Sequence, residues 1–179
     1  MSQSYEIDMC HGPLFGKIIR FSIPLMLSGI LQLLFNAADI IVVGRFVGST
    51  ALAAVGSTSS LINLLINLFI GFSVGANVLV ARFHGAGRDD EVNETVHTAI
   101  TLSMVSGIFL LILGVTVTRT LLIWMGSPDD VLDQSSLYLK IYFLAMPATL
   151  LYNFGSSILR AVGDTKRPLF YLVTAGIIN

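Results

Sequence analysis

The sequence contains few charged residues. Only 12% of its 179 residues are Asp, Glu, Lys or Arg, which is about half the share found in a typical soluble domain. Hydrophobic residues make up 54% of the chain, and the mean hydropathy is +0.82. The net charge of −1 excludes a predominantly basic, nucleic-acid-binding chain. Composition alone therefore predicts an integral membrane protein.

Cysteine and metal-binding motifs are also scarce. The single cysteine, Cys10, cannot form a disulfide within the chain. The three histidines are scattered, without the spacing of a zinc motif or a catalytic triad. We therefore expect no metal site, no cofactor and no enzymatic activity. The N-terminus carries Glu6 and Asp8 and lacks an apolar run before a cleavage site, so we also expect no cleaved signal peptide.

Long apolar segments account for most of the chain, and they predict an all-α, polytopic bundle of transmembrane helices. Four segments are long enough to cross the roughly 30 Å hydrocarbon core as helices, and a fifth is cut short by the end of the sequence. We therefore expect four full helices plus the start of a fifth, in a piece of a longer protein. Pro24 and Pro147 should kink the first and fourth helices. The five predicted helices are 17–43, 51–83, 92–118, 132–162 and 168–179.

The basic residues predict the orientation in the membrane. Seven of them flank the N-terminal end and the links after the second and fourth helices, whereas three lie on the opposite side. Because cytoplasmic loops are enriched in Lys and Arg, we expect a multi-pass protein of the cell (inner or cytoplasmic) membrane, with residues 1–16 as a cytoplasmic segment. A role in binding lipid headgroups is the lesser alternative for these basic residues.

One polar stripe interrupts the first apolar helix. Gln32, Asn36 and Asp39 stand at i, i+4 and i+7 and so share one helix face. Asp39 is the only charged residue between Phe21 and Val43, and a carboxylate in hydrocarbon costs a few kcal/mol. The stripe therefore predicts the lining of an internal cavity, in which Asp39 binds protons or cations. The alternative is an interfacial Asp39 that reaches the outer headgroups or pairs with Arg45.

The second helix also carries a polar pair and a glycine pair. Asn63 and Asn67 lie four residues apart, which favours hydrogen bonds to another helix over the lining of a pathway. Gly71 and Gly75 have the spacing that lets two membrane helices approach closely. We therefore expect this helix to pack closely against a neighbour at its glycine pair.

Four stretches, in order and at this spacing, resemble the N-terminal part of the multidrug and toxic compound extrusion (MATE) family. They are the first helix with the following GRFVG, then ARFHGAGRDDE, MGSPDDVLDQSSLYLKIYF and LRAVGDTKRP. The resemblance covers the chain from about Gly12 to Asn179. It implies a two-lobe fold of twelve helices that alternates between outward-open and inward-open forms. Residues 17–179 would then be a partial N-lobe.

The resemblance also implies roles for single residues. Pro24 matches the proline about which the first helix bends. The residues expected to couple transport to a proton or cation are Asp39, Tyr138 and Asn179. The residues expected to line the substrate cavity, with Asn36 added from the polar stripe, are Gln32, Asn36 and Asn153.

The function that follows is a secondary active multidrug exporter, of the kind that confers antibiotic resistance. We expect amphipathic or cationic small molecules as substrates, H⁺ or Na⁺ as the coupling ion, and the bilayer and the remaining helices of the same transporter as partners. An acid and amides within the membrane favour cationic or neutral cargo. The alternatives are a lipid-linked saccharide exporter of the same superfamily, or, if the chain is complete, a membrane scaffold that transports nothing.

Overall fold

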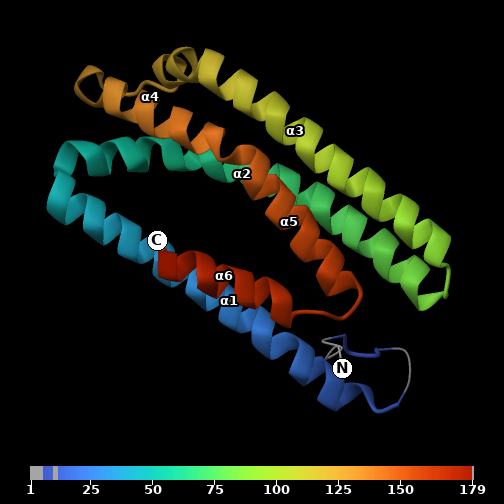
Figure 1. Cartoon of the computed structure of the whole chain (residues 1–179). Coiled ribbons are helices and arrows are strands. Elements are labelled where there is room, and N and C mark those ends of the chain that lie inside the picture. The colour runs from blue at the N-terminus through green and yellow to red at the C-terminus, as the bar shows by residue number, and fades with distance from the viewer. Residues whose placement is uncertain (1–5, 10–11, 179) are drawn as a thin grey trace. The chain divides into compact units, whose positions relative to one another are not determined.

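The computed structural model describes residues 6–9 and 12–178, and every regular element within those ranges is a helix (Figure 1). This confirms the prediction of an all-α fold. Cys10 and Asn179 lie outside the described residues. The elements are α1 (Leu14–Val42), η1 (Val43–Val47, a π-helical stretch), α2 (Ser49–Gly85), α3 (Asp89–Trp124), α4 (Asp129–Leu144), α5 (Met146–Ala161) and α6 (Lys166–Ile178).

Three of these helical stretches are long and apolar enough to cross a membrane. They span Leu14–Phe46, Ala51–Gly85 and Asp89–Trp124. Each extends beyond its predicted range: the first continues through η1, where a link was expected, and the third ends at Trp124 instead of residue 118. Helices can continue into polar residues, as α3 does at its acidic first turn, so the length of an apolar run underestimates the length of the helix.

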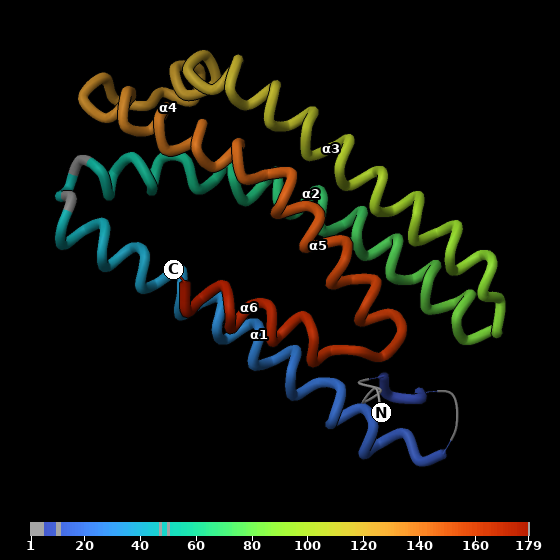
Figure 2. The backbone as a smooth tube through the Cα atoms, viewed as in Figure 1, coloured from blue at the N-terminus to red at the C-terminus, as the bar shows by residue number. Residues whose placement is uncertain are grey.

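The helix predicted over 132–162 is two helices in succession. α4 ends at Leu144 and α5 begins at Met146, and Figure 2 follows the backbone through this junction. With 16 residues each, they reach about 24 Å, less than the roughly 30 Å hydrocarbon core that one helix must cross alone. Pro147 explains the break, because it lacks an amide hydrogen and is tolerated only in the first turn of a helix.

The described chain divides into two compact units, and α1, α2, α3 and α5 each contribute residues to both. Unit 1 comprises Met1–Ala37, Ser73–Ala99 and Phe154–Asn179. Unit 2 comprises Ala38–Phe72 and Ile100–Asn153. Each unit has its own buried side chains and its own contacts between helices.

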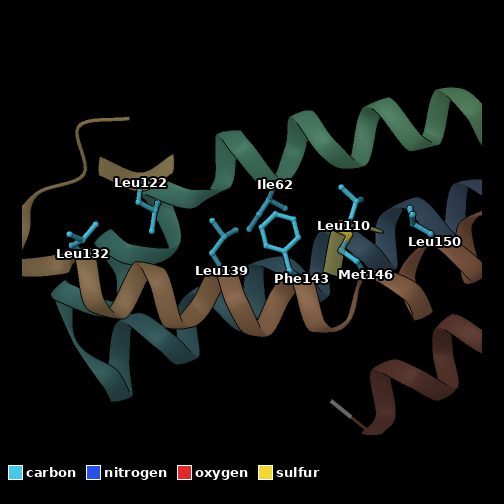
Figure 3. Close-up of a cluster of buried hydrophobic side chains, with 8 residues drawn as sticks. All are labelled: Ile62, Leu110, Leu122, Leu132, Leu139, Phe143, Met146 and Leu150. Atoms are coloured by element: carbon cyan, nitrogen blue, oxygen red, sulfur yellow. The ribbon is translucent and has the colours of Figure 1, made fainter. Parts of the chain in front are cut away.

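Unit 2 contains the buried apolar cluster. Leu139 and Phe143 of α4 point toward Ile62 of α2 (Figure 3). A side chain at Gly114 of α3 would collide with the ring of Phe143, so this glycine makes room for the phenylalanine. The complete cluster is Ile62, Leu110, Leu122, Leu132, Leu139, Phe143, Met146 and Leu150.

Unit 1 buries the apolar side chains of Val80 and Phe154 and also contains polar and backbone contacts between its helices. The amide of Asn77 on α2 donates to the Ser157 carbonyl on α5 at 2.6 Å, and the Ser157 hydroxyl donates to that of Ser73 at 3.3 Å. α6 lies beside α1 (Figure 1), where a side chain at Gly176 would collide with the ring of Phe35. Neighbouring helices in this unit are therefore joined by specific hydrogen bonds and by glycine.

The turn before α6 is organised around Asp164, which is fully buried. Its carboxylate accepts hydrogen bonds from the backbone amides of Lys166 and Arg167, each at 3.1 Å. The Arg167 guanidinium lies 3.2 Å from the same carboxylate. Asp164 therefore caps α6 and satisfies amides at the helix start that have no partner within the helix.

Two expectations about α2 are wrong for the described chain. Gly71 and Gly75 face open space, with no atom within 4 Å of an added Cβ. The Asn67 amide donates to the carbonyl of Asn63 in its own helix, at 2.8 Å, instead of to another helix. Close approaches occur at other glycines instead. The spacing of glycines along a helix does not say which face of the helix meets a neighbour.

Pro24 lies inside α1 and is buried. The Ser28 hydroxyl donates to the Pro24 carbonyl at 2.9 Å. Proline removes one backbone hydrogen bond, and serine bonding to the preceding turn often bends a helix. The first helix thus concentrates two helix-bending features in one turn, and α1 nevertheless continues through them to Val42.

Candidate functional site

Asp39 and Tyr138 both belong to unit 2, near enough for the charge of one to act on the other. Asp39 stands near the end of α1 and Tyr138 stands on α4, a hundred residues later in the chain. The negative charge of the carboxylate acts electrostatically on the tyrosine hydroxyl. Asp39 is exposed and Tyr138 is half-buried, so both remain accessible to an ion or a ligand. The fold thus brings together two residues that were predicted to couple transport to an ion.

Tyr142 adds a second phenol to α4, on the same side as Tyr138. It stands four residues after Tyr138, so the two tyrosines share one side of the helix. Both tyrosines pack against the buried apolar cluster of unit 2. We did not predict a role for Tyr142, although the i, i+4 spacing of two tyrosines on an apolar helix was a signal that could have revealed it.

A hydrogen-bonded serine pair joins α4 to α2 near Tyr138. The hydroxyls of Ser57 and Ser135 lie 3.2 Å apart, and Ser135 is fully buried. Ser135 precedes Tyr138 by three residues and so stands on the same side of α4. The contact holds the helix that carries Tyr138 in place, and nothing in the sequence distinguishes these two serines from the others.

The predicted cavity residues are more dispersed. Gln32 and Asn36 are exposed on α1 and belong to unit 1, whereas Asn153 is half-buried on α5 and belongs to unit 2. Gln32 and Asn36 share a helix face with Asp39, as the spacing predicted. The predicted role of all three in binding substrate stays a prediction, as does that of Asn179, which lies outside the described residues.

Arg45 lies on η1 with an exposed side chain. The alternative in which Asp39 pairs with Arg45 or reaches the outer headgroups stays open beside the interpretation of Asp39 as part of a polar lining.

Pro147 also has a close neighbour in unit 2. A Cβ added to Gly107 of α3 would lie 2.5 Å from the Cα of Pro147. The backbones of α3 and α5 therefore touch just after the junction between α4 and α5. The predicted kink at Pro147 becomes a helix junction supported by a glycine.

Apolar helices of this length define a multi-pass membrane protein. The MatE family model matches residues 24–179, and the chain belongs to the MATE family, a family of transporters and not of enzymes.

Known relatives agree with this assignment. The chain is 35% identical over 159 residues to the probable multidrug resistance protein YoeA of Bacillus subtilis, covering 89% of this chain and 34% of YoeA. It is similar to the crystal structure of a proline-to-alanine mutant of a MATE transporter, with a TM-score of 0.88 and 26% identity over 98% of this chain and 39% of that one. An outward-facing multidrug resistance MATE transporter of the MOP superfamily gives a TM-score of 0.85 at 26% identity, over 98% of this chain and 38% of that one. The chain thus spans little more than a third of the length of these relatives.

Proposed function

We propose that this chain is part of a secondary active multidrug exporter. It would move amphipathic or cationic small molecules outward in exchange for H⁺ or Na⁺. The observation that carries the proposal is the placement of Asp39, a carboxylate, near the end of an apolar helix long enough to cross a membrane and in the same unit as Tyr138. Membership of the MATE family and the similarity to YoeA support it.

Asp39 is the proposed coupling residue. An ionised Asp39 attracts a cationic substrate or Na⁺, and a protonated Asp39 has no charge with which to attract either. Tyr138 has a hydroxyl that can donate a hydrogen bond to the ionised carboxylate. Occupancy of this carboxylate then favours one of two conformations, which is the requirement for alternating access. Substrate and coupling ion exchange because they compete for one negative charge.

The proposed orientation places the protein in the cell (inner or cytoplasmic) membrane, with its N-terminus on the cytoplasmic side. It rests on the excess of basic residues beside the N-terminal end of α1 and in the turns after α2 and α5. α1 then runs outward, and Asp39, near its end, stands in the outer half of the membrane. From there it can exchange protons with the exterior, where a proton gradient supplies them.

Replacing the carboxylate tests the proposal. In cells that express the whole transporter, Asp39→Asn should reduce drug efflux by about tenfold or more, the scale of a coupling free energy of 1–3 kcal/mol. Asp39→Glu should retain part of the activity, and Tyr138→Phe should shift the pH dependence of efflux without abolishing it. The matched control is Asp133→Asn, which removes an exposed carboxylate paired with Arg119.

Efflux and its dependence on external pH are the measurements, and equal amounts of protein in the membrane are confirmed by immunoblotting. If Asp39→Asn pumps drug as the wild type does, with an unchanged pH profile, Asp39 is not the coupling residue. An equal loss in Asp133→Asn would point to impaired folding or insertion instead of coupling.

A further inference from the structure

A cavity of about 430 Å³ in unit 1 opens beside the N-terminal segment. It is lined by that segment, by the first turns of α1 and by the start of α6. Its charged lining residues are Glu6, Asp8, Lys17, Arg20 and Lys166. Three cations and two carboxylates therefore surround one hollow, which is distinct from the Asp39–Tyr138 pair in unit 2.

Hydrogen bonds hold the walls of this cavity together. The Lys17 ammonium donates to the backbone carbonyl of Asp8 at 2.6 Å, which ties the N-terminal segment to α1. The Ile7 amide donates to the Gly163 carbonyl at 3.4 Å, which ties the same segment to the turn before α6. A Cβ on Gly163 would lie 2.5 Å from the Ile7 carbonyl oxygen. The cavity is thus shaped by the fold before any ligand arrives.

The cavity lies where the membrane surface is expected. Lys17 and Arg20 stand in the first two turns of α1, directly before the apolar run that begins at Phe21. Basic residues at the end of a membrane helix lie at the level of the phosphate headgroups. Arg20 and Lys166 are exposed, so a headgroup can reach them from the side.

The mixture of charges selects among headgroups. A purely anionic headgroup would be attracted by the three cations and repelled by Glu6 and Asp8. A phosphoethanolamine headgroup carries a phosphate and a primary ammonium a few bonds apart. The phosphate matches the basic residues, and the ammonium has three N–H donors that carboxylates accept. A choline headgroup has the same charges but no N–H donor.

We propose that this cavity binds the headgroup of phosphatidylethanolamine. Lys17, Arg20 and Lys166 hold the phosphate, and Glu6 and Asp8 accept hydrogen bonds from the ammonium. Because Lys17 and Ile7 also tie the N-terminal segment to α1 and to the turn before α6, the bound lipid fastens these three segments to one another. The proposal does not depend on Asp39 or on transport.

Native mass spectrometry of the whole purified transporter tests the site. The protein is released from detergent micelles that contain equal amounts of phosphatidylethanolamine, phosphatidylcholine and phosphatidylglycerol with identical acyl chains. Because exposed ion pairs contribute modestly, we expect retention of phosphatidylethanolamine over phosphatidylcholine by about fivefold. Excess soluble phosphoethanolamine should displace the bound lipid.

Variants separate the two halves of the site. The double variant Glu6→Gln, Asp8→Asn should remove the preference for ethanolamine over choline and increase binding of phosphatidylglycerol. Arg20→Gln should weaken binding of all three lipids. The control is the pair Arg119→Gln and Asp133→Asn, which neutralises a surface ion pair of unit 2 outside this cavity.

Equal retention of phosphatidylcholine and phosphatidylethanolamine by the unaltered chain would overturn the proposal. Stronger retention of phosphatidylglycerol would overturn it as well, because it would indicate a simple anion site. A preference for ethanolamine that survives in the Glu6→Gln, Asp8→Asn variant would place the lipid elsewhere. None of these outcomes depends on drug efflux, so they leave the proposed role of Asp39 untouched.

Discussion

The two units of the chain achieve their internal packing in different ways. Unit 2 contains the whole buried apolar cluster, with Phe143 fitted against Gly114. Unit 1 buries Val80 and Phe154 outside that cluster and adds the Asn77–Ser157 hydrogen bond, the Asp164 cap and the contact of Ile7 with Gly163. Apolar packing is tolerant of gradual change, whereas directional hydrogen bonds are either made or lost.

This difference matches the chemistry proposed for each unit. The proposed joint action of Asp39 and Tyr138 requires a firm apolar support in unit 2, because the carboxylate and the phenol would have to keep their separation. The hydrogen-bonded contacts of unit 1 surround a charged cavity that a lipid headgroup can stabilise further. Three substitutions test whether the two units differ in this way.

The largest effect is expected from emptying the cluster of unit 2. Phe143 is 2% exposed, and Phe143→Ala should lower the free energy of unfolding by about 3–5 kcal/mol, because it removes buried contacts and leaves a cavity. Unfolding in mixed micelles measures the loss, and hydrogen exchange of peptides from α4 localises it to unit 2. Adding Gly114→Ala to the Phe143→Ala variant should restore part of the stability, since the new methyl group occupies the vacated space.

The control is Phe109→Ala in the same unit, where the side chain is 61% exposed. It should change the free energy of unfolding by less than about 0.5 kcal/mol. Similar losses for Phe143→Ala and Phe109→Ala would mean that unit 2 does not depend on its buried cluster, and the contrast between the units would fail.

An intermediate effect is expected from the tight turn of unit 1. Gly163 has a φ of +88° and Gly87 has a φ of +67°, so alanine at either position should cost about 1–2 kcal/mol from the left-handed backbone. Gly163→Ala should cost more, because its Cβ would also meet the Ile7 carbonyl oxygen, whereas the surroundings of Gly87 are open. The difference between their free energies of unfolding isolates the steric part. Identical values would show that the N-terminal segment does not pack against this turn.

The smallest effect is expected from one interhelical hydrogen bond. Asn77→Ala removes the bond to the Ser157 carbonyl and should lower the free energy of unfolding by about 0.6 kcal/mol, the average for such bonds in membrane proteins. Asn67→Ala is the matched control, because the Asn67 amide bonds within its own helix. Faster hydrogen exchange in peptides of α5 should accompany Asn77→Ala only. If Asn67→Ala lowered the free energy of unfolding more than Asn77→Ala, the hydrogen bond from Asn77 would not be the one that stabilises the helix contact.

The helices could be predicted from the sequence because each contains an apolar run long enough to span a bilayer. Their contacts could not, since in such helices apolar residues occupy both the packed and the lipid-facing sides. The pattern therefore did not reveal that Gly107 and Gly114 are packed while Gly71 and Gly75 are open. The break before Pro147 was expected as a kink, because local sequence marks the position of a bend but not its size.

The candidate site was partly predictable for a similar reason. Asp39 is conspicuous because a lone carboxylate in an apolar run needs an explanation. Tyr138 was indicated by the resemblance to the MATE family, and Tyr142 was missed because an aromatic residue on a membrane helix is ordinarily a packing residue. The Ser57–Ser135 contact joins residues 78 positions apart, and no local pattern encodes that distance.

The touching backbones at Gly107 and Pro147 also bear on how α3 and α5 could move. Where side chains of two helices interdigitate, they must separate before either helix can rotate against the other. At the contact between Gly107 and Pro147 no long side chains interdigitate, so we expect one helix to rotate against the other there with a low energy barrier. The close contact leaves no room for a methyl group at Gly107. A spectroscopic probe attached there would block the movement, whereas a probe at Gly71 or Gly75 would stand in open space and report on it.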